Sequence, residues 1–195
     1  MARHGETEWN RQGRMQGQLD SPLTPDGLNH AAALADYVAA LEVDLVASSP
    51  IGRSRTTAQT CADRLGLEIM IIDELAEVHH GAMAGMTPAE VEARFPGVLE
   101  RRLLDKYRWR FPGGESYADA DERAARALGL IAETDARIPL IISHEMMGRM
   151  LLRNLLDGRL EDALATQQPH QLVYRVNPST REVQRLSTQQ SDGVR

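Results

Sequence analysis

Short apolar runs alternate with longer amphipathic stretches along most of the chain, and this pattern is the first guide to its structure. Runs of about four to eight apolar residues between turn-forming residues are typical of buried strands. We therefore predict strands at residues 44–48, 68–72 and 139–143. A terminal hairpin is predicted from residues 172–176 and 182–186.

Helix start signals and apolar spacing predict helices between these strands. Thr24 and Pro25 suit the N-cap and the first position of a helix. The segment from Thr87 to Glu90 has the form of a capping box. Three further helices are predicted, one with Arg53 near its start, one over residues 116–136 and one over residues 144–156. The faces expected to be buried carry Leu28, Ala31, Ala35 and Val38 in the first helix, and Ala125, Leu128 and Ala132 in the long one.

Strands separated by helices indicate a largely parallel sheet that is covered by helices on both faces. A length of 195 residues fits one domain with a sizeable core. We therefore predict a single α/β domain over residues 1–195, built as a three-layer α/β/α sandwich with a mostly parallel central sheet.

Polar residues with catalytic potential follow three of the predicted strands. Arg53 comes just after the strand at residues 44–48, Glu77 after residues 68–72, and His144 directly after residues 139–143. In open parallel sheets, ligands bind beyond the carboxyl ends of the strands. The three side chains are therefore expected to meet at one edge of the sheet.

The amino end departs from this scheme. His4 should follow a strand in the same way, but Met1 and Ala2 lead directly into Arg3 and His4 without an apolar run. The domain is therefore expected to lack its usual N-terminal strand. Either the chain is truncated, or its start lies downstream of the true one, or the strand is supplied in an unusual way.

Several segments together resemble a known family. The first holds residues 3–10, Arg-His-Gly-Glu-Thr-Glu-Trp-Asn, followed by Arg14-Met15-Gln16-Gly17. The others are Leu23 to Gly27, Ser48 to Ala58, Glu74 to Glu77, Pro112 to Ser116 and Ile142 to His144. In this order they closely resemble the signature of the histidine phosphatase superfamily, which includes the phosphoglycerate mutase-like proteins. The resemblance covers most of the chain and implies a phosphoglycerate mutase-like fold.

This resemblance implies a role for each matching residue. His4 would be the nucleophile that becomes phosphorylated, with the Gly5 backbone holding its second ring nitrogen. Glu77 would be the acid and then the base, and His144 would stabilise the transferred phosphoryl group. Arg side chains bind phosphate oxygens through a planar fork of donors. The phosphate ligands implied are Arg3, Arg53, Asn10 and Gln16.

The implied activity is metal-independent hydrolysis of a small phosphorylated substrate, a phosphomonoester, with no cofactor. The segment between Glu77 and Pro112 is shorter than in phosphoglycerate mutases, which favours a phosphatase over a cofactor-dependent mutase. Glu145 stands where the family usually has Gly, so we expect it to face outward, to pair with an arginine, or to select a cationic substrate. A phospho-ligand binding module without turnover is a third alternative.

Other residues have simpler interpretations. Adjacent His79 and His80 are a weak candidate for a metal site, because no acidic partner motif accompanies them. His30 and His170 are expected to be structural or solvated. The basic run is interpreted as a solvated helix face, or as an overhang that reads a second acidic group; it comprises Arg101, Arg102, Lys106, Arg108 and Arg110.

Composition narrows the classes of function. A net charge of −6 argues against nucleic-acid binding, which depends on a basic surface. No apolar run approaches the roughly 20 residues that span a membrane, and no leader of the signal-peptide kind is visible. Cys61 is the only cysteine, and we expect it to be buried. A cytoplasmic protein is expected, and a homodimer is compatible with the sequence.

Overall fold

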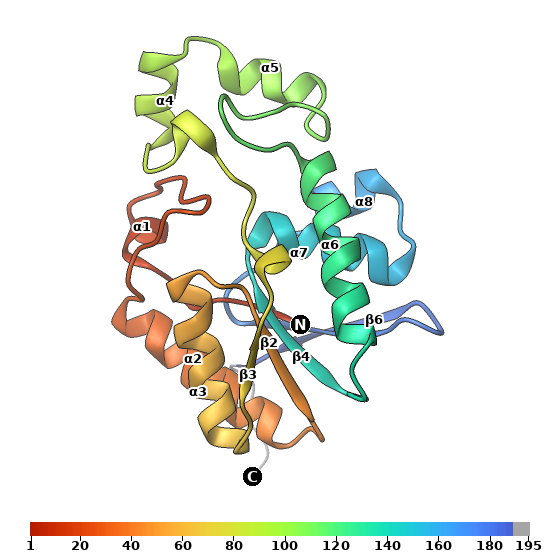
Figure 1. Ribbon diagram of the computed structural model, residues 1–195. Helices are drawn as coiled ribbons and strands as arrows, with labels where there is room; N and C mark the ends of the chain where they lie inside the picture. Colours follow the sequence, from red (N-terminus) through yellow and green to blue (C-terminus); the bar gives the residue numbers. More distant parts are fainter. Residues whose placement is uncertain (189–195) are drawn as a thin grey trace.

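The computed structural model describes residues 1–188, in which strands and helices alternate (Figure 1). The strands are β1 (Ala2–Arg3), β2 (Leu45–Ser48), β3 (Ile69–Ile71), β4 (Pro139–Ser143), β5 (Leu172–Asn177) and β6 (Glu182–Ser187). The helices are α1 (Glu8–Arg11), α2 (Pro25–Ala39), α3 (Gly52–Leu65), α4 (Pro88–Arg94), α5 (Val98–Leu104), α6 (Tyr117–Ala132), α7 (Glu145–Leu156) and α8 (Leu160–Ala165). Two short 3-10 helices are η1 (Asp73–Leu75) and η2 (Gly81–Met83).

The strands form one six-stranded sheet in the order β3-β2-β4-β1-β5-β6. The first four strands of this order are parallel neighbours. β5 pairs antiparallel with β1 and forms the predicted hairpin with β6. The mostly parallel sheet expected from the sequence is therefore confirmed.

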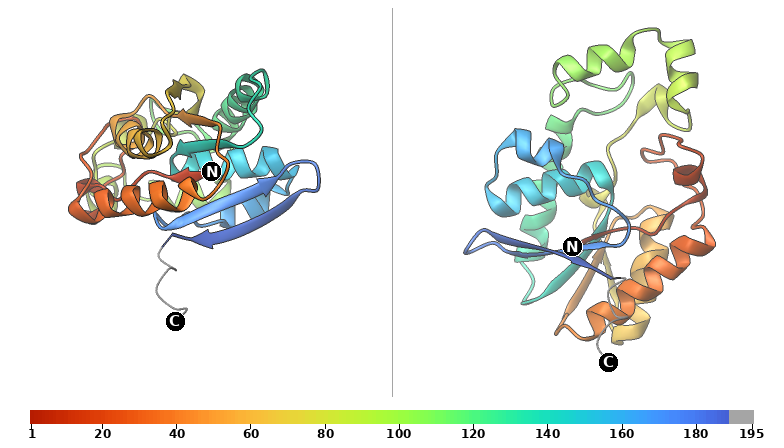
Figure 2. Two further views of the ribbon diagram at one scale, coloured as in Figure 1. Left: turned by 90° about the horizontal axis from the view of Figure 1, so that it is seen from below. Right: turned by 180° about the vertical axis from the view of Figure 1, so that it is seen from behind.

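Helices cover both faces of the sheet, which confirms the three-layer sandwich (Figure 2). Successive side chains of a strand point to opposite faces. Val46 and Leu140 accordingly pack in one core with α2 and α3, whereas Ala47 and Ile141 pack in a second core with α6 and α7. Cys61 is fully buried in the first core, as expected.

The element boundaries agree with the predictions in most places, but two buried faces differ. Leu28 is 51% exposed, whereas its predicted partners Ala31, Ala35 and Val38 are buried. In α6 the buried row is Tyr117, Ala120, Ala124, Ala127 and Ile131, so the face predicted from Ala125, Leu128 and Ala132 is wrong. Alanines lie on both sides of this helix, and the anchor that decides its orientation is the buried Tyr117 at its start.

The amino end contributes a very short strand where the sequence shows no apolar run. Ala2 and Arg3 form β1 between β4 and β5, and Ala2 is buried. Two residues suffice because neighbouring strands flank them on both sides and supply hydrogen-bonding partners. His4 therefore does follow a strand, as Arg53, Glu77 and His144 do.

The helices α4 and α5 lie beyond the carboxyl ends of the parallel strands, at the top of Figure 1. Thr87 and Glu90 form the predicted capping box at the start of α4. Within residues 1–188, no helix has both the length and the apolar character required to cross a membrane.

Candidate active site

His4 lies directly after β1 and is only 2% exposed. Its backbone N–H donates to Ser143 O at 3.0 Å, which ties the residue to the end of β4. Its ring Nδ1 donates to Gly5 O at 2.7 Å, as the family resemblance implied. Burial lowers the pKa of His4 well below its usual value, and His144, Arg3 and Arg53 add to this effect. The ring is therefore neutral, and its unprotonated Nε2 can accept a hydrogen bond.

Gly5 allows the chain to turn away from His4 in very little space. A β-carbon at this position would lie 2.2 Å from Gly27 O, at the start of α2. The Gly5 N–H donates to the Thr57 hydroxyl of α3 at 3.0 Å. The loop after His4 is thus packed between two helices of one face.

Arg53, in the first turn of α3, is the charged group in direct contact with His4. Its Nε donates to His4 Nε2 at 3.2 Å. The same guanidinium donates to Gly17 O at 2.7 Å and to Leu19 O at 2.6 Å, and it lies 3.3 Å from Asp20 Oδ1. Arg53 therefore connects His4 to the loop that precedes α2.

His144 directly follows β4 and forms the N-cap position of α7, with 1% of its surface exposed. Its ring centroid lies 5.2 Å from that of His4, and its Nε2 lies 2.8 Å from the Ser49 hydroxyl. Burial lowers its pKa well below the usual value, and the charges of Arg53, Arg3 and Arg123 lower it further. A second neutral histidine thus faces His4.

Glu77 follows η1 and is 6% exposed. Its carboxylate accepts hydrogen bonds from the backbone N–H groups of Val78 at 2.9 Å, Met147 at 2.9 Å and Met146 at 3.1 Å. Two of these donors belong to the first turn of α7, where an anion is favoured by the helix dipole. The charge of Glu77 opposes the lowering of the pKa of Arg3 and Arg53 by burial, which shows that it acts on both arginines.

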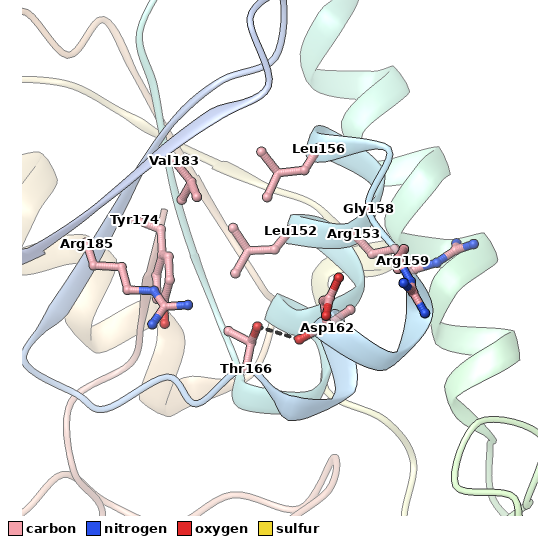
Figure 3. Close-up of a pocket in the computed structure, with 11 residues that line it drawn as sticks. Leu152, Arg153, Leu156, Gly158, Arg159, Asp162, Thr166, Tyr174, Val183 and Arg185 are labelled. Atoms are coloured by element: carbon pink, nitrogen blue, oxygen red, sulfur yellow. Dashed lines mark hydrogen bonds between the residues drawn. The ribbon is translucent and has the colours of Figure 1, made fainter.

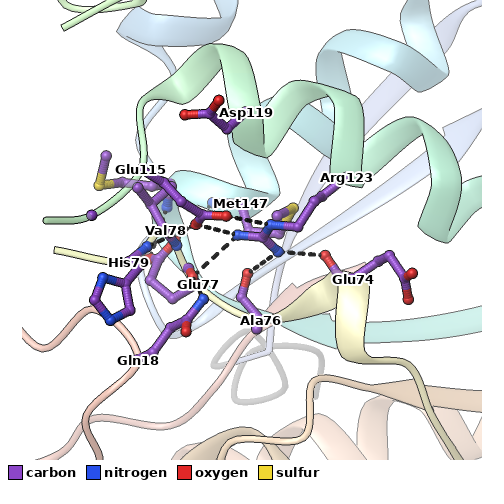
Figure 4. A network of polar contacts seen from close by, with 12 residues as sticks. Gln18, Glu74, Ala76, Glu77, Val78, His79, Glu115, Asp119, Arg123 and Met147 are labelled. Carbon is purple, nitrogen blue, oxygen red and sulfur yellow. Dashed lines mark hydrogen bonds and ion pairs between the residues drawn. The ribbon is translucent and has the colours of Figure 1, made fainter. Parts of the chain in front are cut away.

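A network that the sequence analysis missed holds the backbone around Glu77 (Figure 4). Arg123 of α6 donates to the carbonyl oxygens of Glu74, Ala76 and Glu77 at 2.7, 2.8 and 3.3 Å. It also forms two hydrogen bonds with the Glu115 carboxylate, at 2.9 and 2.8 Å. Arg123 stands in the middle of a helix, so no local signal marked it as part of the site.

Arg3 and Glu145 form a salt bridge with each other. Arg3 Nη1 is 3.0 Å from Glu145 Oε2, and Arg149 Nη2 is 2.6 Å from Glu145 Oε1. The expectation that Glu145 pairs with an arginine is confirmed, and the partner is one of the predicted phosphate ligands.

The side-chain oxygens of Asn10 and Gln16 differ in their hydrogen bonding. Asn10 Oδ1 accepts from the Thr7 backbone at 3.1 Å and from the Thr7 hydroxyl at 2.9 Å, so this oxygen caps α1. Gln16 is 7% exposed, and its Oε1 has no protein partner among residues 1–188. It precedes Gly17, whose carbonyl binds Arg53.

His170 also lies beside His4, although the sequence analysis predicted only a structural or solvated role for it. Its Nδ1 donates to His4 O at 2.6 Å, and the two ring centroids are 5.5 Å apart. Burial lowers its pKa to about 4. His30 stacks on its other side at 5.9 Å. The signal that could have identified His170 is its place directly before β5, next to β1 in the sheet.

The basic run begins in α5, with Arg101 and Arg102, and continues beyond the end of this helix at Leu104. Arg101, Arg108 and Arg110 are exposed. Arg102 lies over the Phe111 ring at 5.4 Å, and Lys106 donates to Leu164 O at 3.3 Å. The solvated-face interpretation therefore holds for only part of the run.

His79 and His80 have separate contacts. His79 Nδ1 accepts from the Gly81 N–H at 3.1 Å, whereas His80 Nε2 lies 3.2 Å from the Met146 sulfur. Over residues 1–188, no group of three or more His, Cys, Asp or Glu side chains is arranged to hold a metal ion.

A small cavity of about 80 Å³ lies elsewhere, between α7, α8 and the hairpin (Figure 3). Leu152 and Leu156 line it from α7, and Tyr174, Val183 and Arg185 line it from the hairpin. None of the residues singled out as catalytic or phosphate-binding contributes to it.

Comparisons with known proteins identify the family of the chain. Residues 1–189 match the histidine phosphatase superfamily (branch 1). The chain is 32% identical to phosphoserine phosphatase 1 of Hydrogenobacter thermophilus, over 80% of this chain and 74% of that protein. It is 42% identical to glucosyl-3-phosphoglycerate phosphatase of Mycolicibacterium vanbaalenii, over 64% of this chain and 55% of that protein. A probable phosphoglycerate mutase of Serratia proteamaculans is 36% identical, over 74% of this chain and 67% of that protein.

Solved structures give the same result. A mycobacterial glucosyl-3-phosphoglycerate phosphatase in complex with VO3 superimposes with a TM-score of 0.76 at 29% identity, covering 84% of this chain and 83% of that one. The α-ribazole phosphatase of Shigella flexneri, at 23% identity, shares the fold with a TM-score of 0.83 over 100% of this chain and 97% of its own. The chain belongs to the histidine phosphatase superfamily.

Proposed function

We propose that this protein is a phosphatase that hydrolyses a small phosphomonoester through a phosphohistidine at His4. The observation that carries the proposal is the state of the His4 ring. Nδ1 is engaged by Gly5 O, and Nε2 is the acceptor of Arg53 Nε at 3.2 Å. A neutral imidazole whose Nε2 lone pair accepts from a guanidinium can exchange this hydrogen bond for a bond to phosphorus, with the positive charge close to the phosphate group.

The first step transfers the phosphoryl group to the protein. His4 Nε2 forms a bond to phosphorus as the bond to the ester oxygen breaks, and Glu77 in its protonated form gives a proton to the leaving alcohol. Arg3, Arg53 and His144 stabilise the charge on the three equatorial oxygens. Asn10 and Gln16 complete the set of proposed phosphate ligands as neutral groups.

The second step returns His4 to its free form. A water molecule attacks phosphorus and gives its proton to the Glu77 carboxylate, while the bond between phosphorus and Nε2 breaks. Inorganic phosphate leaves, and Glu77 is protonated again for the next cycle. No metal ion takes part in either step.

Phosphoryl transfer of the phosphoglycerate mutase type is the alternative, because one relative carries that name. The phosphatase is favoured by the short segment between Glu77 and Pro112 and by the names of the two other relatives described above. The structural relative that was solved with VO3 further supports an oxyanion-binding pocket.

The test is hydrolysis of p-nitrophenyl phosphate with EDTA present, comparing the wild type with His4→Ala. We expect turnover by the wild type and a loss of at least about 10³-fold in the variant, as for the removal of other catalytic nucleophiles. Circular dichroism would verify that the variant is folded. Equal turnover by both proteins would contradict the assignment of His4, and turnover that stops with EDTA would contradict the metal-independent mechanism.

A further inference from the structure

Only some of the hydrogen-bonding groups of Arg3 have partners among the residues that the structure describes. Its side chain is 14% exposed. Nη1 donates to Gln168 O at 3.2 Å and lies 3.0 Å from Glu145 Oε2. Nε is buried and has no protein partner among the described residues. Arg3 can therefore present donors to a phosphoryl group while Nη1 stays with Glu145.

Glu145 is itself held by a rigid neighbour. Arg149, one turn further along α7, lies 2.6 Å from Glu145 Oε1. The remaining nitrogens of Arg149 donate to Thr166 O at 2.7 Å and to the Tyr117 hydroxyl at 2.6 Å, and Tyr117 is 1% exposed. All three nitrogens of this guanidinium are thus engaged. Glu145 is consequently fixed and cannot follow Arg3 toward a ligand without losing Arg149.

The positive charges of the candidate site are already partly compensated. Glu145 pairs with Arg3, and Asp20 pairs with Arg53 at 3.3 Å. The N-terminus of α7, which would otherwise favour an anion, donates the N–H groups of Met146 and Met147 to Glu77. A phosphate dianion that binds at the candidate site therefore competes with carboxylates for its ligands.

We propose that Glu145 is a positioning residue that orients Arg3 and weakens the binding of inorganic phosphate, so that the product leaves readily. The proposal rests on the proposed function, because that function makes Arg3 a phosphate ligand. Binding the substrate and the transition state equally tightly does not raise the rate of the chemical step, and a tightly held product slows turnover. A carboxylate that lowers the affinity for free phosphate avoids this cost.

The proposal is tested by titrating the protein with inorganic phosphate in an isothermal calorimeter. Glu145→Gln keeps an oxygen that accepts from Arg149 but removes the negative charge. We expect the dissociation constant for phosphate to fall roughly threefold to fivefold, the size typical of one partly exposed ion pair. The inhibition constant of phosphate against hydrolysis should fall by the same factor.

The matched control is Glu161→Gln, which removes the same charge from an exposed ion pair with Arg159 at the start of α8. This control should bind phosphate as the wild type does. If Glu145→Gln binds phosphate with wild-type or weaker affinity, the proposal is overturned. The same is true if the control tightens binding equally.

A double-variant comparison shows whether Glu145 acts through Arg3. Glu145→Gln should tighten phosphate binding in the wild-type background and have little effect in an Arg3→Gln background. An equal gain in both backgrounds would overturn the positioning role, since the charge would then act directly on the ligand.

These binding measurements need no turnover, so they separate the two claims. A protein that binds phosphate as predicted but does not hydrolyse esters would contradict only the proposed function. Hydrolysis with an unchanged phosphate affinity in Glu145→Gln would contradict only the role of Glu145. A wild type that binds no phosphate would overturn the role of Glu145 together with that of Arg3.

Discussion

The two sides of the candidate site are held in place by different means. On the His4 side, side chains that follow the ends of β1, β2 and β4 face one another. Arg53 donates to His4, and the ring centroids of His144 and His4 are 5.2 Å apart. On the Glu77 side, the carboxylate is bound by backbone N–H groups, and Arg123 holds the backbone that carries it. The position of the His4 side therefore depends on the ends of the strands. The position of the Glu77 side depends on Arg123 of α6, a helix that is far from Glu77 in the sequence.

The largest expected effect concerns the His4 side. Arg53→Ala removes the donor next to Nε2 and the support of the loop at Gly17, so kcat/KM for an aryl phosphate should fall by about 10³-fold, near the upper value for one stabilising donor. Arg64→Ala, near the end of the same helix and 56% exposed, is the control. A loss smaller than tenfold would show that Arg53 is not essential to this side.

The Glu77 side should respond according to the leaving group. Glu77→Gln removes the proton donor, and alkyl phosphates need this proton more than aryl phosphates do. We expect kcat/KM to fall by about 10²-fold or more for an alkyl ester, with a clearly smaller loss for p-nitrophenyl phosphate. Glu74→Gln on the same segment serves as the control. Equal losses for both esters would remove the acid role from Glu77.

Arg123→Met tests whether the second side really depends on α6. It leaves the Glu115 carboxylate without its cation, although the His79 N–H still donates to it. It also removes a donor from three backbone carbonyls, of which Glu77 O keeps Gln18 Nε2. The free energy of unfolding should therefore fall by about 3 kcal/mol in urea titrations. Activity should fall together with stability, and more for alkyl than for aryl esters, because Glu77 loses its fixed position. Arg126→Met changes an exposed arginine of the same helix and should leave both quantities unchanged. Wild-type stability of Arg123→Met would mean that other contacts hold the segment.

The dependence of stability on pH involves both sides. Burial lowers the pKa of His170, beside His4, to about 4, and that of His80, near Glu77, to about 3. Both rings are neutral in the folded protein, whereas in the unfolded chain they bind protons below about pH 6.5. The unfolded state therefore gains protons first, and the free energy of unfolding should decrease as pH falls from about 6.5 toward 4, by about 1.4 kcal/mol per pH unit for each ring.

Urea unfolding of His80→Leu and of the wild type at pH 7 and pH 5 measures this contribution, since the carboxylates are common to both proteins. The variant should lose less stability than the wild type between the two pH values. An equal loss would show that His80 is not protonated on unfolding in this range.

The two sides also differ in how many of their residues could be predicted from the sequence. Arg53, Glu77 and His144 each follow a strand, so their convergence follows from the topology of a parallel sheet. Arg123 and His170 act through backbone carbonyls of segments far away in the chain, and such contacts leave no local pattern. The buried face of α6 was predicted incorrectly for a related reason, because alanines on several sides of a helix do not reveal which side the core needs. The strand β1 was not predicted because two residues are too few to show an alternation of apolar and polar positions.

The hydrogen bonds of Glu77 give its proposed chemistry a mechanical consequence. The same carboxylate that would carry the proton also accepts from the second and third amides of α7, at Met146 and Met147. A protonated carboxyl group is a weaker acceptor than a carboxylate, so these amides should be held less firmly in one half of the cycle than in the other. The helix that follows His144 would then loosen and tighten at its first turn once per turnover, in step with the proton.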